Sequence, residues 1–132
     1  MRVGISVALG LFGALVAGNI VAANAKKNDG NFLLSKCNAT IRVMDGEKLS
    51  ANTDELGIGQ CFGLVEGVRN TLVYLNDFVE SDLKICWPEE GIPNGQAVRI
   101  LVKYLNEHPA DLNDDQTLLT MMAFKKAYPC KT

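Results

Sequence analysis

Four stretches of the chain place apolar residues at the spacing of amphipathic α-helices. They cover residues 31–38, 60–79, 94–107 and 113–128. Within each stretch the apolar positions recur every three or four residues, which places them on one face of a helix. The segments between them contain proline, glycine and polar residues, which favour turns and loops. The pattern therefore predicts an all-α fold, a small bundle of about four helices.

The segment from Thr40 to Leu56 fits this pattern least well. It is largely polar and contains Asp45-Gly46, a dipeptide that is typical of turns. Either a short hairpin or an irregular loop would fit this part of the chain.

The second predicted helix carries a line of glycines. Gly59, Gly63 and Gly67 are spaced four residues apart and so lie along one side of the helix. A glycine inside a helix costs about 1 kcal/mol relative to alanine, so three in register indicate that another backbone comes close. That backbone belongs either to a helix of the same chain, in a tight crossing, or to a second copy in a homodimer.

The first 25 residues form an apolar leader with a single charge, Arg2. The leader ends in Ala23-Asn24-Ala25, which places small side chains at the positions that signal peptidase reads. Lys26-Lys27 beyond this point opposes the charge asymmetry of a stable membrane anchor. We therefore predict a signal peptide over residues 1–25, cleaved after Ala25, and one exported domain over residues 26–132.

Length and charge limit the class of protein. The chain has 132 residues and a formal net charge of -2, which allows one small domain. A charge this close to zero gives no surface that would bind the phosphates of nucleic acid. We therefore expect no nucleic-acid partner and, after leader removal, no membrane association.

All four cysteines follow the leader. An even number in an exported chain predicts two disulfides, and the spacing lacks the paired C-x-x-C knuckles of a zinc site. If consecutive helices are antiparallel, the end of the first helix meets the start of the second. The segment before the third helix then lies beside the end of the fourth. Among three possible pairings, this layout favours Cys37–Cys61 and Cys86–Cys130.

The exported domain is poor in catalytic groups. Its single histidine, His108, precedes Pro109 at a predicted helix end, where a histidine can bond a free carbonyl and complement the helix dipole. With the cysteines paired, no thiol nucleophile remains. The acidic segment 111–115 lacks the glycine and the glutamate that a calcium loop requires. We therefore expect a binding protein that is not an enzyme and has no metal or cofactor.

Two acidic segments and one tryptophan are candidates for contact with a protein partner. The candidate residues are Trp87, Glu89, Glu90, Asp111, Asp114 and Asp115. The aspartates also have a structural interpretation, because acids stabilise the first turn of a helix. Trp87 either packs over the adjacent disulfide or is exposed as an anchor for a partner.

Four motifs of the exported domain resemble one known family. They are G-Q-C-F-G-L-V-E-G-V at residues 59–68, C-W-P-E-E-G-I-P-N-G-Q at 86–96, V-K-Y-L-N-E-H-P at 102–109 and A-Y-P-C at 127–130. Together they are similar to the Rap/Tai immunity proteins, and the resemblance extends from about Leu33 to Cys130. Proteins of that family are small, exported by Gram-negative bacteria and linked to type VI secretion.

The resemblance implies an all-helical, frequently dimeric periplasmic protein that binds and blocks a peptidoglycan amidase delivered by neighbouring cells. Many members have no known effector, so the resemblance also allows an orphan binding protein of the same fold. Our candidate for the part that enters the amidase cleft is the loop over residues 106–115. We expect a disulfide and helix packing to hold its base, while its tip is polar.

A different class of protein has a similar composition. Periplasmic stress-protective chaperones are also small, helical and disulfide-linked. Such a protein binds unfolded clients through exposed apolar surface, for which Met121 and Met122 are candidates.

Overall fold

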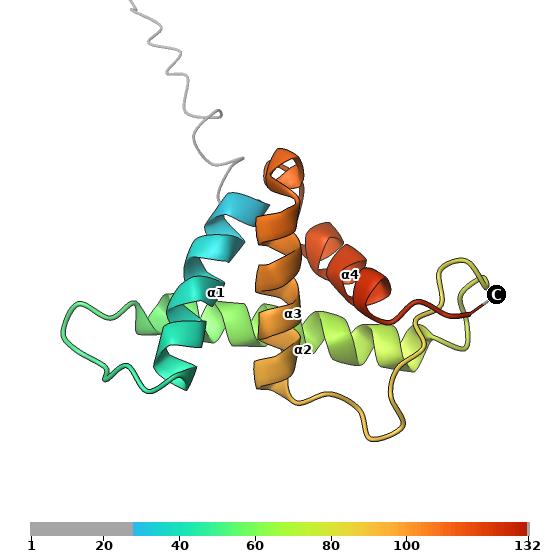
Figure 1. Cartoon of the computed structure of the whole chain (residues 1–132), viewed down its shortest axis with the longest axis horizontal. Coiled ribbons are helices and arrows are strands. Elements are labelled where there is room, and N and C mark those ends of the chain that lie inside the picture. Colours follow the sequence, from blue (N-terminus) through green and yellow to red (C-terminus); the bar gives the residue numbers. More distant parts are fainter. Residues whose placement is uncertain (1–27, 132) are drawn as a thin grey trace, which may run out of the picture.

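The structure is a computed structural model that describes residues 28–131, so the predicted signal peptide lies outside the described residues. Four α-helices and one short 3-10 helix make up this part of the chain (Figure 1). Their bounds are α1, Gly30–Met44; α2, Glu55–Leu75; α3, Asn94–Glu107; η1, Pro109–Asp111; and α4, Gln116–Ala127. The described residues form no strand beyond isolated bridges, and the predicted all-α fold is confirmed.

The longest helix, α2, contacts each of the other three (Figure 1). α1 and α3 lie side by side across it, and α4 packs against both α2 and α3. Their inner faces meet in a core whose largest fully buried side chains include Val65, Leu101, Leu105 and Phe124. The first three belong to the apolar faces that the sequence pattern predicts. None of the helices within residues 28–131 is both long and apolar enough to cross a membrane.

Three of the four α-helices have an aspartate as their N-cap residue. Each accepts a hydrogen bond from a backbone N–H of the first turn, a group that the helix itself leaves without a partner. These caps are Asp29 at α1, Asp54 at α2 and Asp115 at α4. Pro93 takes this position at α3 and makes no side-chain cap.

The first helix is longer than the sequence pattern predicts. α1 continues to Met44, and the expectation of a hairpin or loop from Thr40 onward is wrong for its last turn. Thr40 is fully buried. Its hydroxyl donates to the carbonyl of Lys36 one turn earlier, and this bond satisfies the polar group inside the helix. Ile41 and Met44 pack against the core. An irregular connection over residues 45–54 follows, without a strand in this described segment.

The second helix begins and ends earlier than expected. α2 spans Glu55–Leu75 instead of residues 60–79, because the cap formed by Asp54 starts the helix five residues ahead of the predicted start. At its end, the side chain of Asn76 accepts a hydrogen bond from the N–H of Ile85, 2.9 Å away. This bond folds the following turns back along the end of the helix.

Both predicted disulfides are confirmed. Cys37–Cys61 joins α1 to α2 with a Cα–Cα distance of 5.2 Å, and both residues are fully buried. Cys86–Cys130 joins the segment before α3 to the C-terminal end, with a Cα–Cα distance of 5.0 Å. An antiparallel bridge between Ile85 and Pro129 lies beside the second disulfide.

The glycine line of α2 does not meet another helix of the chain. A Cβ atom built on Gly59, Gly63 or Gly67 would have no atom of the described residues within 4 Å beyond its own neighbours. The interpretation of a tight crossing within the chain is therefore wrong. The line faces away from the core, which leaves the homodimer alternative as a proposal.

Candidate partner-binding site

The loop over residues 106–115, here called the α3–α4 loop, lies at one end of the bundle (Figure 1). It consists of short turns in series: the N–H of Asp111 donates to the carbonyl of His108, and the N–H of Asp114 donates to that of Asp111. These bonds measure 3.1 and 2.9 Å. The internal hydrogen bonds give the loop a defined shape.

The N-terminal residues of the described chain hold the base of this loop. The N–H of Gly30 donates to the carbonyl of Asp114 at 3.2 Å, and the N–H of Asn31 donates to that of Leu112 at 3.1 Å. On the other side, the N–H of Gln116 donates to the carbonyl of Asn28 at 3.0 Å. This contact could not be predicted from the sequence, because no periodicity or motif marks a pairing between segments more than 80 residues apart.

The three aspartates of the loop have different surroundings. Asp115 is exposed but caps α4, accepting from the N–H groups of Thr117 at 2.9 Å and Leu118 at 3.1 Å. Asp114 is exposed and Asp111 is half-buried. Burial raises the pKa of Tyr104, and the carboxylates of Asp111 and Asp114 raise it further. These two carboxylates therefore place negative charge next to a buried phenol.

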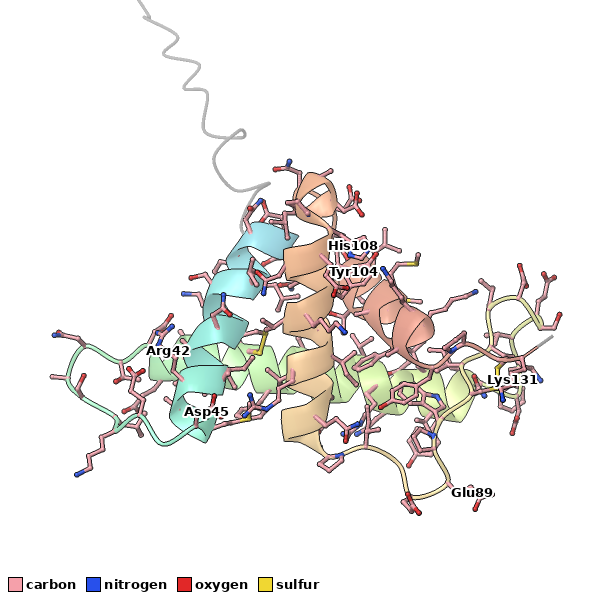
Figure 2. The ribbon with its side chains drawn as sticks, in the orientation of Figure 1. Arg42, Asp45, Glu89, Tyr104, His108 and Lys131 are labelled. Atoms are coloured by element: carbon pink, nitrogen blue, oxygen red, sulfur yellow. A yellow bond between two sulfur atoms is a disulfide. The ribbon has the colours of Figure 1, made fainter. Side chains whose placement is uncertain are left out.

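His108 has the structural role that its position in the sequence predicts. Its Nδ1 lies 2.7 Å from the carbonyl oxygen of Tyr104, and its ring stacks on that of Tyr104 with centroids 4.1 Å apart (Figure 2). Its Nε2 lies 3.0 Å from Nζ of Lys126. A carbonyl oxygen can only accept, so Nδ1 is the donor in the hydrogen bond to Tyr104. The ring joins the end of α3 to α4.

The second acidic segment lies far from the loop. Glu89 and Glu90 are exposed in the connection before α3, while the α3–α4 loop follows the other end of that helix (Figure 2). α3 has 14 residues and is therefore about 20 Å long. The structure thus brings Asp111, Asp114 and Asp115 together and leaves the glutamates at the opposite end.

Trp87 is half-buried within an aromatic cluster. Its ring lies 5.4 Å from that of Phe124 and 5.7 Å from that of Tyr128, measured between centroids. Such tilted pairs stabilise a core beyond the area that they bury. The ring is therefore engaged inside the molecule.

Two open grooves border α4. One, of about 440 Å³, lies between α3 and α4 next to the loop, and its lining includes Lys103, Tyr104, Glu107 and Lys126. The other, of about 500 Å³, lies between α2 and α4 and is lined largely by apolar groups, including Gly63, Gly67, Leu72 and Met121. Neither groove is evident from the sequence, because the walls of each come from two helices.

No cluster of three or more histidine, cysteine or acidic residues within residues 28–131 has the arrangement of a metal site.

Comparison with known proteins gives one result. A family model described as Rap1a immunity proteins matches residues 29–130, which confirms the resemblance drawn from the four motifs. No curated protein and no solved structure matches the chain.

Proposed function

The chain belongs to the Rap1a immunity protein family, and on this premise we propose that it blocks a peptidoglycan amidase effector of type VI secretion in the periplasm. In this proposal the leader directs export, the two disulfides stabilise the exported domain, and the protein acts by binding without catalysis. The family supports an effector as the partner. The amidase class of that effector is the part that we propose.

The observation that carries the proposal is the acidic loop with a fixed base. An amidase that cleaves cell-wall peptide must have a cleft that admits an anionic substrate. A loop bearing Asp111 and Asp114 matches the charge of that substrate, and complementary charge speeds association and favours the correct partner. Because hydrogen bonds to residues 28–31 hold the C-terminal side of the loop, little chain entropy is lost when it enters a cleft.

The test is a capture experiment followed by an enzyme assay. The mature chain, carrying an affinity tag and expressed with its leader, is used to capture proteins from a bacterium that secretes effectors. We expect a captured protein that hydrolyses purified peptidoglycan and loses this activity when an equimolar amount of the mature chain is added. A captured protein without hydrolase activity, or one that the chain does not inhibit, contradicts the proposal.

We include a homodimer in the proposal, formed through the outer side of α2. Leu56 and Tyr74 are 74% and 79% exposed and lie on the same side of the helix as Gly63 and Gly67. Uncovered apolar side chains beside a smooth backbone favour contact with another helix. Gly63→Arg should shift the mass measured by sedimentation towards the monomer, whereas Ser35→Arg on the exposed side of α1 should not. A wild-type protein that sediments as a monomer at inhibitory concentrations contradicts this part.

The chaperone alternative has one specific observation in its favour. Leu118, Met121 and Met122 on α4 are between 40% and 49% exposed, and flexible methionines suit varied apolar clients. A chaperone of this kind would suppress the aggregation of an unrelated denatured protein. It would lose this effect in the Met121→Ser, Met122→Ser double variant. An immunity protein would show neither behaviour.

A further inference from the structure

Two donors of Asn31 converge on one carbonyl of the α3–α4 loop. Its backbone N–H lies 3.1 Å from the oxygen of Leu112, and its side-chain Nδ2 lies 2.9 Å from the same oxygen. Asn31 is exposed, so its amide could be hydrated by water but is bonded to the loop instead. A carbonyl oxygen has two lone pairs, and this arrangement supplies a donor for each.

Gly30 allows the two segments to come this close. A Cβ atom at this position would lie 2.5 Å from Cδ1 of Leu119 and 3.1 Å from both the Cα and the carbonyl oxygen of Leu112. The leucine side chain can move, but the two backbone atoms of Leu112 belong to the loop itself. Any larger residue than glycine therefore pushes the loop away from α1.

The remaining contacts surround this pair. Asn28 accepts from the N–H of Gln116, and Asp29 forms an antiparallel bridge with Asp115. Residues 28–31 thus contact the loop on both sides of Asn113, the exposed residue between Leu112 and Asp114. The loop is attached at its C-terminal side to the first turn of α1 in addition to its own helices.

We propose that residues 28–31 are a positioning element for partner binding, with Asn31 as the positioning residue. This inference rests on the proposed role of the α3–α4 loop. The segment holds the loop in one conformation before the partner arrives, so that the carboxylates of Asp111 and Asp114 are presented together. Without it, the loop samples other conformations and the affinity falls by the fraction of time spent in them.

This role is separable from global stability. Asn31 lies in the first turn of α1, and its side-chain bond is exposed and outside the core. Local opening of such a contact needs much less free energy than unfolding of the whole domain. Its loss should therefore change the loop and leave the unfolding midpoint nearly unchanged, a pattern that a merely structural residue would not give.

The test compares Asn31→Ala and Asn31→Asp with the wild type. Both variants remove the donor, and the aspartate keeps the size of the side chain while adding an acid that suits the first turn of a helix. Amide hydrogen exchange of the mature chain should speed up at residues 112–116 by about three- to tenfold, as expected for one lost hydrogen bond. The matched control is Asn38→Ala, two turns further along α1.

The binding measurement uses the amidase captured by the wild-type protein. Inhibition of peptidoglycan hydrolysis by Asn31→Ala should need about three- to tenfold more protein, with an unchanged urea midpoint. Unaltered exchange in both variants overturns the positioning role whether or not an amidase is found. Faster exchange with unaltered inhibition also overturns it. A wild-type protein that inhibits no amidase refutes the proposed function, and the exchange measurement is then read alone.

Discussion

Asp29 and Asp115 occupy equivalent positions at the starts of α1 and α4, and their backbones pair in an antiparallel bridge. Each carboxylate accepts a hydrogen bond from the first turn of its own helix. The N-terminal ends of two helices, which carry partial positive charge, therefore meet at one place with an acid on each. The base of the α3–α4 loop lies directly at this pair.

The pair predicts that Asp115 acts mainly on stability. Replacing Asp115 with alanine should lower the free energy of unfolding by about 1 kcal/mol, because two N–H groups of α4 lose their acceptor. Urea denaturation followed by circular dichroism measures this change. Asp114→Ala is the control, with an expected change below about 0.5 kcal/mol. Equal losses of unfolding free energy in the two variants would show that the cap formed by Asp115 does not stabilise the domain more than an uncapped surface aspartate does.

Asp111 and Asp114 should act mainly on binding. Asparagine at both positions keeps their size and removes two negative charges. We expect weaker inhibition of the captured amidase and faster dissociation, measured by surface plasmon resonance at two salt concentrations. The control is Glu89→Gln with Glu90→Gln, which removes equal charge at the opposite end of α3. If the affinity stays unchanged in the first variant, the loop does not enter the cleft.

The same two carboxylates make a prediction about alkaline pH. The pKa of Tyr104 is raised, first by burial and then by Asp111 and Asp114. The folded state therefore favours the neutral phenol. Its contribution to stability is complete below about pH 10, where an unfolded tyrosine ionises, and is lost as the pH rises through the folded pKa. Asparagine at positions 111 and 114 should lower the pKa of Tyr104, seen by NMR of labelled tyrosine. A pKa that does not fall would mean that neither carboxylate acts on the phenol.

The disulfides should differ in their effect on stability. In the chain-entropy model, Cys37–Cys61 contributes about 3.5 kcal/mol and Cys86–Cys130, which closes the longer loop, about 4 kcal/mol. Alanine pairs at each disulfide, compared by urea denaturation of the oxidised proteins, test this order. Because Cys37 and Cys61 are fully buried, their replacement also leaves a cavity. A larger loss at Cys37–Cys61 would therefore assign more weight to packing than to loop closure.

The sequence predicted what depends on the order of helices and missed what depends on tertiary contact. The pairing of Cys37 with Cys61 was predicted from antiparallel neighbours, but the structure places Cys37 in the middle of α1, where that helix crosses α2 (Figure 1). The role of His108 follows from its place at a helix end. The prediction of a loop from Thr40 onward was wrong because threonine counts as polar in the sequence pattern, although its hydroxyl bonds within its own helix and can be buried. The prediction of a tight crossing at Gly63 was wrong because glycine is compatible both with a close backbone contact and with open space, and here the space is open. The contact of Asn31 with Leu112 could not be predicted, because neither hydrophobic periodicity nor a local motif indicates it.

The position of the leader gives a final prediction. Asn28 contacts the loop base and lies three residues beyond the predicted cleavage site at Ala25. Three extended residues span about 10 Å. A leader that stayed in the membrane would thus hold the base of the α3–α4 loop close to the bilayer, where we expect that an amidase could not surround the loop. On the proposed function, we therefore predict that removal of the leader is required for protection as well as for release.

An uncleaved form of the precursor tests this condition. Ala23→Leu with Ala25→Phe should block cleavage, leave the domain membrane-bound and abolish protection of cells against the captured amidase. A flexible linker of about 20 residues inserted before Asn28 reaches roughly 25 Å and should restore protection while the leader remains. Membrane fractionation confirms the location of both forms. If the uncleaved form protects without the linker, the loop is accessible beside the membrane and access does not depend on cleavage.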